Sequence, residues 1–210
     1  IRSGGVMSLS GVEVKNTVTN QGTLESTDCT YSSYIKISTT TGLSGSNNTF
    51  MGECFRLDGF SGVTGDLLPF LSEDCSDEVY IGFYGNIYTT TISNISDILP
   101  GGYKLVYHLT VASGHTVTLE EGVSINQQNL DINVKGTLKA EYAEVADAFF
   151  STTDGASLYV EKGGVVELQN ANINFSRYGE VYVYDGGCFS MTGGSMIASY
   201  YGTNIRSGGV

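Results

Sequence analysis

The carboxylates of this 210-residue chain are densest between residues 73 and 78, where the sequence reads EDCSDE. Calcium prefers several carboxylate and carbonyl oxygens, which such a run can supply. The run lacks the D-x-[DN]-x-[DN]-G pattern of a calcium-binding loop, so a solvated acidic loop is the favoured interpretation. We expect no cofactor. The one candidate metal site is a weak calcium site with the ligands Glu73, Asp74, Asp77 and Glu78.

Two of the four cysteines, Cys54 and Cys75, lie close to this acidic run. A bond between them would close a loop of about 22 residues and restrict the unfolded chain by roughly 3 kcal/mol in the chain-entropy model. We predict a Cys54–Cys75 disulfide, with two unbonded thiols as the alternative. The cysteines show no Cys-x-x-Cys spacing and the chain has only 2 His, so a structural zinc site lacks its ligand pairs.

After metal binding and disulfide formation, hydrolysis is the third kind of chemistry that the residue types allow. Four acids could supply a general acid/base pair: Glu141, Glu144, Asp147 and Asp154. The simpler interpretation is that these residues point outward and keep the chain soluble. His108 and His115 lie in a strand-rich stretch at a spacing that puts them on opposite faces, so they are poor joint metal ligands. The chain has no Gly-x-Ser-x-Gly elbow, P-loop or His-Glu-x-x-His motif, and we expect it not to be an enzyme.

The overall composition restricts the classes of fold and partner. Charged residues make up 15% of the chain, below the roughly 25% of an average soluble domain, and 28 glycines disfavour long helices. The net charge of −12 repels phosphate backbones, so nucleic acid is excluded as a partner. No apolar run approaches the roughly 20 residues that span a bilayer. An acidic, glycine-rich chain with an even number of cysteines indicates an extracellular or cell-surface location.

The first six residues, Ile1–Val6, recur unchanged as Ile205–Val210, 204 residues further along the chain. A given six-residue match has a chance probability of about 20 to the power −6 in random sequence, so coincidence or an expression artefact is the less favoured explanation. We therefore interpret the chain as one 204-residue unit of a tandem array, in which residues 205–210 overlap the start of the next unit.

A shorter repeat begins on glycine. Counted from each glycine of the set, apolar residues recur at positions +2 and +4 and again at +7 and +9. This alternation is the period-two signature of strands with one buried face, and the phase change between +4 and +7 marks a bend. The rung-start glycines are Gly5, Gly22, Gly136, Gly164 and Gly187.

A further short alternating stretch precedes these glycines, as in Leu158–Val160 and Val181–Val183. Gly164, Gly187 and Gly209 follow one another at intervals of 23 and 22 residues. This spacing suits one turn of a three-sided coil, in which each strand pairs in parallel with its copy in the next turn. The predicted fold is therefore all-β: a right-handed parallel β-helix, or β-solenoid, with rungs of about 22 residues.

The repeat also places the two remaining cysteines. Cys29 occupies an inward +7 position, where we expect a buried core thiol. Cys188, at +1, should point outward or lie in a corner, where it could bond to a neighbouring chain. The two cysteines are two rungs apart in the tandem interpretation, about 9.6 Å, which is beyond the reach of a disulfide.

Residues 42–85 break the repeat, and we interpret them as one irregular acidic insertion that contains Cys54 and Cys75. The β-solenoid rungs then occupy residues 1–41, which continue from the preceding unit, and residues 86–210.

Two stretches carry a family resemblance. Residues 107–143 (YHLTVASGHTVTLEEGVSINQQNLDINVKGTLKAEYA) resemble the opening turns of right-handed parallel β-helix domains in bacterial and archaeal surface proteins. Residues 187–199 (GCFSMTGGSMIAS) resemble the repeats of large adhesin-like surface proteins. The resemblance covers roughly residues 86–210 and 1–41. It implies the fold and leaves the function open, because the family includes adhesins, sheath and surface-layer components and polysaccharide-cleaving enzymes.

We expect a mechanical function: a structural repeat unit of an extracellular surface polymer, such as a fibre, sheath or stalk. A solenoid turn cannot close its own ladder, so the expected partners are copies of the chain itself, end to end and, as a further option, side by side. The first alternative is an adhesin or carbohydrate-binding module, and the second is a polysaccharide lyase or hydrolase. The glycan-binding face of the adhesin alternative would be Tyr178, Tyr182, Tyr184, Tyr200 and Tyr201.

Overall fold

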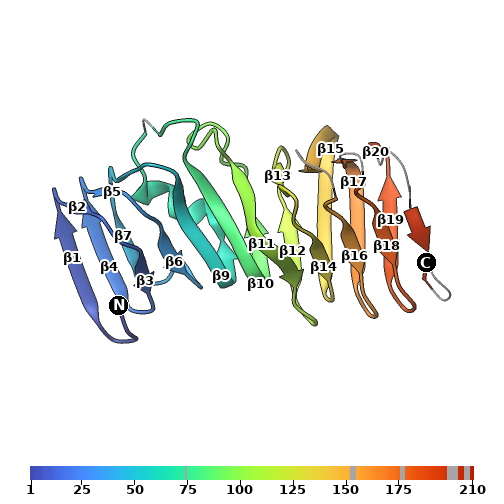
Figure 1. Cartoon of the computed structure of the whole chain (residues 1–210), viewed down its shortest axis with the longest axis horizontal. Helices are drawn as coiled ribbons and strands as arrows, with labels where there is room; N and C mark the ends of the chain where they lie inside the picture. The colour runs from blue at the N-terminus through green and yellow to red at the C-terminus, as the bar shows by residue number, and fades with distance from the viewer. Residues whose placement is uncertain (74, 152–154, 176–177, 198–202, 206–208) are drawn as a thin grey trace.

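The protein is built almost entirely of β-strands (Figure 1). The strands wind into a parallel β-solenoid of about 7 turns, which confirms the predicted fold class. The two chain termini lie at opposite ends of the long axis (Figure 1). Within the described ranges no helix is long and apolar enough to cross a membrane. The structure is a computed structural model that describes residues 1–73, 75–151, 155–175, 178–197, 203–205 (backbone only) and 209–210.

Three short strands make each of the first two coils. Each coil begins on the three-stranded sheet β1–β4–β7, crosses the sheet β2–β5–β8 and ends on β3 or β6, which belong to the longest sheet. Every strand pairs in parallel with the strand one coil later. The bounds are β1 Val6–Ser10, β2 Glu13–Val14, β3 Val18–Asn20, β4 Thr23–Thr27, β5 Thr30–Tyr31, β6 Ile35–Ile37, β7 Leu43–Ser46 and β8 Thr49–Phe50.

Three longer strands occupy the middle of the solenoid, where each bends around one or two corners. These are β9 (Glu53–Val63), β10 (Tyr80–Ile92) and β11 (Tyr103–Val111). Strand β10 pairs with β9 on one side and with both β11 and β12 on the other. A short 3-10 helix, η1 (Thr64–Phe70), follows β9.

The insertion predicted over residues 42–85 is narrower than expected. Strands β7, β8 and β9 and the start of β10 all pair with neighbouring coils, so most of the segment belongs to the solenoid. Only the stretch from η1 to Val79 leaves the strand pattern, apart from a single bridge between Asn48 and Leu71. The apolar alternation is lost in β7, which reads Leu-Ser-Gly-Ser, because a Cβ at Gly45 would lie 1.8 Å from the carbonyl oxygen of Ser26.

The C-terminal half repeats a three-strand coil of about 23 residues. One column of stacked strands comprises β12, β15, β17 and β19, and another comprises β14, β16, β18 and β21. The third is formed by β13, by the ends of β15 and β17, and by β20. The bounds are β12 Thr116–Leu119, β13 Ile125–Asn126, β14 Ile132–Val134, β15 Thr137–Phe150, β16 Leu158–Val160, β17 Val165–Asn174, β18 Val181–Val183, β19 Cys188–Thr192, β20 Met196–Ile197 and β21 Thr203–Ile205.

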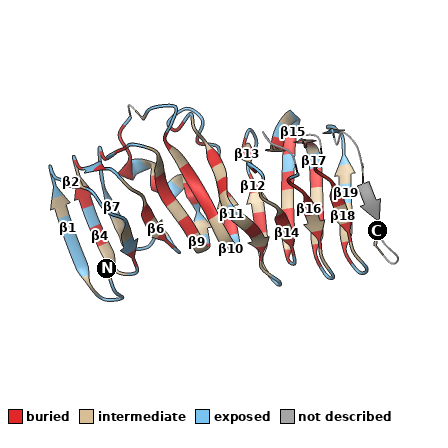
Figure 2. Cartoon of the chain, in the orientation of Figure 1, coloured by how far each residue is buried: buried red, intermediate tan, exposed pale blue. Residues whose placement is uncertain are grey.

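Side chains at the +2 and +4 positions of the inner coils point into the core, as the alternation predicts (Figure 2). Leu24, Leu138 and Val166 are each 2% exposed or less. Aliphatic and aromatic side chains from successive coils therefore form one continuous apolar column along the axis. Burial of this column is the main favourable term in folding.

The coil that starts at Gly136 departs from the predicted pattern. Ala143 and Val145 stand at its +7 and +9 positions, yet both face solvent, and Val145 is 60% exposed. Relative to β17, strand β15 carries extra residues between Glu141 and Ala146, which shifts the register. The extra residues bulge outward, and the core position passes to Tyr142, which is 1% exposed.

In four of the five coils, all except the one that starts at Gly136, the predicted bend lies six residues after the rung-start glycine, where the backbone turns left-handed. The φ angle is +63° at Gly11, +57° at Asp28, +55° at Asn170 and +68° at Gly193. Glycine, asparagine and aspartate tolerate this conformation better than other residues. A glycine, asparagine or aspartate at position +6 therefore indicates the corner directly. The apolar alternation indicates it only through its change of phase.

Asn48 ties three coils together from inside the molecule. Its side chain is 0% exposed. Its Oδ1 accepts hydrogen bonds from the Ser26 hydroxyl at 2.9 Å and the Cys29 amide at 3.1 Å. Its Nδ2 donates to the carbonyls of Ser26 and Phe70, both at 2.8 Å. All four hydrogen-bonding positions of this amide are used, which offsets the cost of burying it.

Four of the five rung-start glycines, all except Gly5, are required because the backbone of the preceding coil passes very close. A Cβ at Gly164 would lie 2.0 Å from the carbonyl oxygen of Val134, and one at Gly136 would lie 2.3 Å from that of Ala112. Both obstacles are backbone atoms and cannot swing away as a side chain could. These positions therefore exclude any side chain.

We expect Gly164→Ala to lower the free energy of unfolding by about 1–3 kcal/mol, because the coils must move apart to admit the methyl group. Equilibrium denaturation in urea measures the change. The matched control is Gly52→Ala, since a Cβ there meets nothing within 4 Å, and its stability should equal that of the parent. Equal losses in the two variants would contradict the close-contact explanation.

Candidate functional site

The repeated hexapeptide forms a tight corner of the solenoid. In the N-terminal copy, Ile1–Val6, Gly4 has a φ of +77° and the amide of Gly5 donates to the carbonyl of Arg2 at 2.9 Å. The corners before β17 and β19 have the same form, with φ of +78° and +76° at their first glycine and the corresponding bonds at 2.8 and 2.9 Å. The repeated sequence is thus one instance of a corner that the chain uses internally.

The C-terminal copy enters a new coil in register. Strand β21 pairs with β18. The amide of Val210 then donates to the carbonyl of Gly187 at 3.1 Å. The amide of Thr23 donates in the same way to the carbonyl of Gly5 at 2.8 Å. Val210 therefore begins the first strand of a coil, as Val6 does. Residues 206–208 lie outside the described residues.

The outermost described coils expose side chains that inner coils bury. Met7 pairs with Leu24 across β1 and β4, yet Met7 is 39% exposed and Leu24 is 0% exposed. At the other end Phe189 and Met191 of β19 are only partly buried, whereas their register partners on β17, Val166 and Leu168, are buried. Both ends of the described solenoid thus present apolar side chains next to strand edges.

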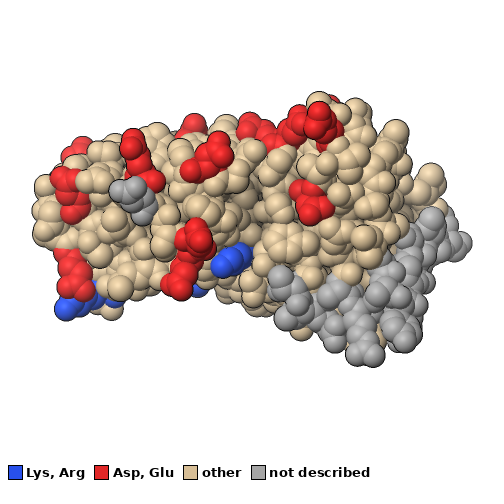
Figure 3. Space-filling model, turned by 90° about the horizontal axis from the view of Figure 1, so that it is seen from above, with Lys and Arg blue, Asp and Glu red and all other residues tan. Residues whose placement is uncertain are grey.

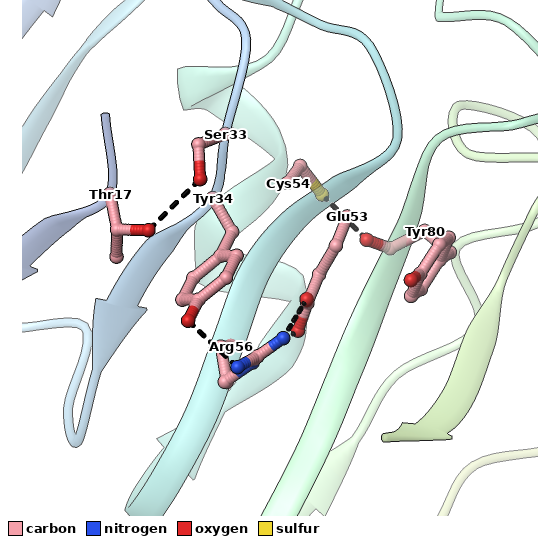
Figure 4. Close-up of polar contacts among 7 residues, drawn as sticks. All are labelled: Thr17, Ser33, Tyr34, Glu53, Cys54, Arg56 and Tyr80. Atoms are coloured by element: carbon pink, nitrogen blue, oxygen red, sulfur yellow. Dashed lines mark hydrogen bonds and ion pairs between the residues drawn. The ribbon is translucent and has the colours of Figure 1, made fainter. Parts of the chain in front are cut away.

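A second set of functional side chains lies on the outer surface of β6, β9 and β10, around Arg56 (Figure 4). The guanidinium donates to both carboxylate oxygens of Glu53 and, at 2.7 Å, to the hydroxyl of Tyr34. Its central carbon also lies 3.7 Å from the centroid of the Tyr34 ring. The Glu53 carboxylate lies against Gly82, where a Cβ would come within 2.1 Å of it. Arg56 therefore donates three hydrogen bonds within the protein and joins neighbouring coils.

Basic residues share one outward column on this surface. Lys36, Arg56, Gly82 and Lys104 are paired in register across four successive strands. Lys36 forms an ion pair with Asp58, whereas Lys104 lies over the ring of Tyr80 with its Nζ 4.2 Å from the centroid. The face seen from above carries many acidic and few basic side chains (Figure 3).

Tyrosines stack on a different column of strands, the one formed by β14, β16 and β18. Tyr159 on β16 and Tyr182 on β18 are register partners whose rings stack with centroids 5.0 Å apart and an interplanar angle of 7°. Tyr184 lies beside them, 6.3 Å from Tyr159. Of the predicted glycan-binding face, Tyr178 is 42% exposed, whereas Tyr200 and Tyr201 lie outside the described residues.

The hydroxyl of Tyr182 is hydrogen-bonded to the carboxylate of Glu180, which raises the pKa of Tyr182 to about 12. Glu180 itself is 6% exposed. Burial raises the pKa of Tyr159, whose hydroxyl is hydrogen-bonded to Ser157. Tyr159 was not among the predicted site residues. Its stack on Tyr182 could have been predicted, because Leu158–Val160 aligns with Val181–Val183 and places the two tyrosines at equivalent positions of successive coils.

His108 contacts an acid one coil away. The amide of Asp131 donates to Nδ1 of His108 at 3.0 Å, which places the proton of the neutral ring on Nε2. Asp131 Oδ1 accepts from the Ser157 amide at 2.9 Å, and burial raises the pKa of this carboxyl group. His115 instead meets Tyr88 edge-on, so the two histidines form no shared site.

The predicted Cys54–Cys75 disulfide is not formed in the structure, where both residues are thiols. Each thiol donates to a backbone carbonyl at 3.2 Å, Cys54 to Tyr80 and Cys75 to Ser72. The direction in which each thiol points is set by the backbone around it and not by the length of the loop between the two cysteines. Burial raises the pKa of Cys54, so its thiol stays protonated.

The other two cysteines differ in burial. Cys29 is 1% exposed in the core, at its inward position, and its thiol donates to the carbonyl of Thr27 at 3.4 Å. Cys188 is partly exposed at the start of β19, opposite Val165. Bonding of Cys188 to a neighbouring chain stays a prediction.

The weak calcium candidate gains no support from the described residues, among which no group of three or more histidines, cysteines and acids could hold a metal ion. Glu73, Asp77 and Glu78 flank a loop, and Asp74 lies outside the described residues.

The candidate catalytic acids do not converge in the described residues. Glu141 and Glu144 are exposed. Asp147 accepts hydrogen bonds from the side-chain amides of Asn172 and Asn174, both at 3.0 Å. Asp154 lies outside the described residues. The described geometry thus provides no paired carboxylates from this group.

Comparison of the chain with protein-family models, with curated proteins and with solved structures finds no match.

We expect Arg56→Leu to lower the free energy of unfolding by about 3 kcal/mol, because it leaves the carboxylate of Glu53, only 7% exposed, without its partner. Lys36→Leu is the control, since its ion pair with Asp58 is more exposed and should contribute about 1 kcal/mol or less. Thermal and urea denaturation measure both. If Arg56→Leu is no more damaging than Lys36→Leu, the cluster around Arg56 does not join the coils as described.

Proposed function

We propose that the chain is a structural repeat unit of an extracellular surface polymer, in which successive units stack end to end as one continuous β-solenoid. The observation that carries this proposal is the identity of the two hexapeptides. Ile1–Val6 and Ile205–Val210 share one sequence, and both lead into the first strand of a coil. A chain that continues after Val210 with the residues that follow Val6 would keep the corner unchanged.

The strand edges and apolar side chains of the outermost coils support stacking. Strand β1 pairs only with β4 among the described strands, so its other edge presents unpaired amides and carbonyls. In a stack, strand β1 of one unit would pair with β19 of the preceding unit, because Val210 already pairs with β19. Met7 would then be covered as Leu24 is within the unit. The proposal assigns the chain a mechanical role and no catalytic one.

Two units joined through one shared hexapeptide, so that Met7 of the second follows Val210 of the first, test the proposal. We expect this chain to unfold in one cooperative transition at a higher temperature than the single unit, because the joint buries apolar surface and adds a strand ladder. Hydrogen exchange should show slowed amides in β1 of the second unit.

The control for the two-unit chain has three extra residues, Gly-Ser-Gly, inserted between Val210 and Met7. This insertion interrupts the first strand of the second unit after its first residue and removes the register. The control should unfold as two independent units. Equal behaviour of the two chains would contradict end-to-end stacking. Electron microscopy of the native material should show uniform filaments.

Carbohydrate binding is a second candidate function, favoured by a surface hollow of about 450 Å³ beside Lys104. Tyr80, Val106 and Gln128 also line the hollow. No acidic side chain of the described residues forms an ion pair with Lys104. The ring of Tyr80 and the ammonium group of Lys104, which forms none of these ion pairs, together suit an acidic sugar.

We expect Lys104→Ala to weaken the binding of polygalacturonate, an acidic polysaccharide, by about tenfold, because a charge-assisted hydrogen bond is lost. Isothermal titration calorimetry at low salt measures the affinity. Lys15→Ala is the control, since Lys15 is 74% exposed on the first coils, away from the hollow. Absence of binding to the parent chain, or an equal loss in both variants, argues against this second function.

A further inference from the structure

We propose that Tyr159 and Tyr182 form a site of oxidative cross-linking, at which a one-electron oxidant joins the two rings through a carbon–carbon bond between adjacent coils. This modification does not depend on end-to-end stacking, because both tyrosines belong to one chain.

The two phenols are held in the arrangement that ring coupling requires. Tyr159 and Tyr182 are direct partners across the parallel strands β16 and β18. Their rings are nearly parallel, with an interplanar angle of 7° and centroids 5.0 Å apart. Both side chains are half-buried on the outer surface, so a diffusing oxidant reaches them while the strands limit their motion. Because the two ring faces lie against each other, movement of the side chains alone, with the strands in place, can bring two ring carbons next to the hydroxyls to bonding distance.

Glu180 provides an acceptor for the phenolic proton. The hydroxyl of Tyr182 is hydrogen-bonded to the Glu180 carboxylate, and this bond holds the pKa of Tyr182 well above its usual value. Tyr182, like any tyrosine, is a protonated phenol at neutral pH, and its hydrogen bond to Glu180 gives the proton a direct path to the carboxylate as the electron leaves. Charge-assisted hydrogen bonds of this kind are short and strong.

The chemistry balances with a peroxide oxidant acting through a peroxidase. Each phenol loses one electron and its hydroxyl proton and becomes a phenoxyl radical. The two radicals combine to form a bond between the ring carbons ortho to the oxygens. Each of these carbons then transfers its hydrogen to oxygen as a proton, which restores both phenols. The pair loses two electrons and two protons in total, and one hydrogen peroxide with two protons is reduced to two waters.

A second tyrosine pair among the described residues is equally close and provides a comparison within the chain. Tyr84 and Tyr107 have centroids 4.9 Å apart and an interplanar angle of 28°. Lys36 and Arg56 each have a cationic group 5.8 Å from the centroid of the Tyr84 ring. These positive charges oppose removal of an electron from Tyr84. Coupling should therefore favour Tyr159 and Tyr182 over Tyr84 and Tyr107.

The experiment treats the 210-residue chain, at low concentration, with a haem peroxidase and hydrogen peroxide, and follows dityrosine fluorescence. Peptide mapping by mass spectrometry should identify one main product: the peptides of Tyr159 and Tyr182 joined, two hydrogens lighter than their sum. The cross-linked chain should have a higher melting temperature, because the bond prevents two coils from separating.

Tyr182→Phe should abolish this product, and circular dichroism should show an unchanged fold because the ring is kept. Tyr88→Phe is the matched control, since Tyr88 is 36% exposed and its ring meets His115, and it should leave the yield unchanged. Glu180→Gln should reduce the yield, because the amide is a poor proton acceptor. The proposal is overturned if the dityrosine fluorescence of Tyr182→Phe equals that of the parent chain, or if coupling occurs mainly between chains or at Tyr84 and Tyr107.

Discussion

The hydrogen-bonded ladder between parallel strands is the constraint on which the rest of this molecule depends. The amide of Val165 donates to the carbonyl of Gly136 at 2.8 Å, and the amide of Cys188 donates to that of Gly164 at 3.0 Å. Each coil must therefore return its backbone to a place about 4.8 Å beyond the previous one. Positions at which the backbones come closest accept only glycine, and positions at which the chain turns left-handed accept glycine, asparagine or aspartate.

The ladder fixes where strands begin, but it does not fix how many residues a coil contains. Val6 pairs with Thr23, 17 residues on, whereas Ile132 pairs with Leu158, 26 residues on. The difference is absorbed where no ladder bond is lost, at the corners and at the outward bulge within β15. The same freedom explains the segment from η1 to Val79, which leaves the strands between β9 and β10 without breaking their pairing.

The fold could be predicted from sequence because its strongest signals, the glycine spacing and the apolar alternation, are local. Features that depend on coil length could not. The cluster of Arg56, Glu53 and Gly82 forms because β9 pairs with β10 at an offset of 26 residues, with a register shift next to Tyr80. No repeat in the sequence predicts this offset or this shift. The predicted disulfide used only the chain distance between two cysteines, and that distance carries no information about where each thiol points. The stack of Tyr159 on Tyr182 could be predicted, because the coil between these two residues has the regular length of the repeat.

Stacking coils at this spacing brings outward residues into columns, which is a hazard for a chain with a net charge of −12. Like charges directly opposite each other on neighbouring strands are destabilising. Among the register pairs of the described strands, no acid faces another acid. Glu25 faces Ser8, Glu167 faces Lys139 and Asp147 faces Asn172. The placement of hydroxyls, amides and lysines between the acids allows an acidic chain to form a β-solenoid, and the same placement would be needed at any joint between units.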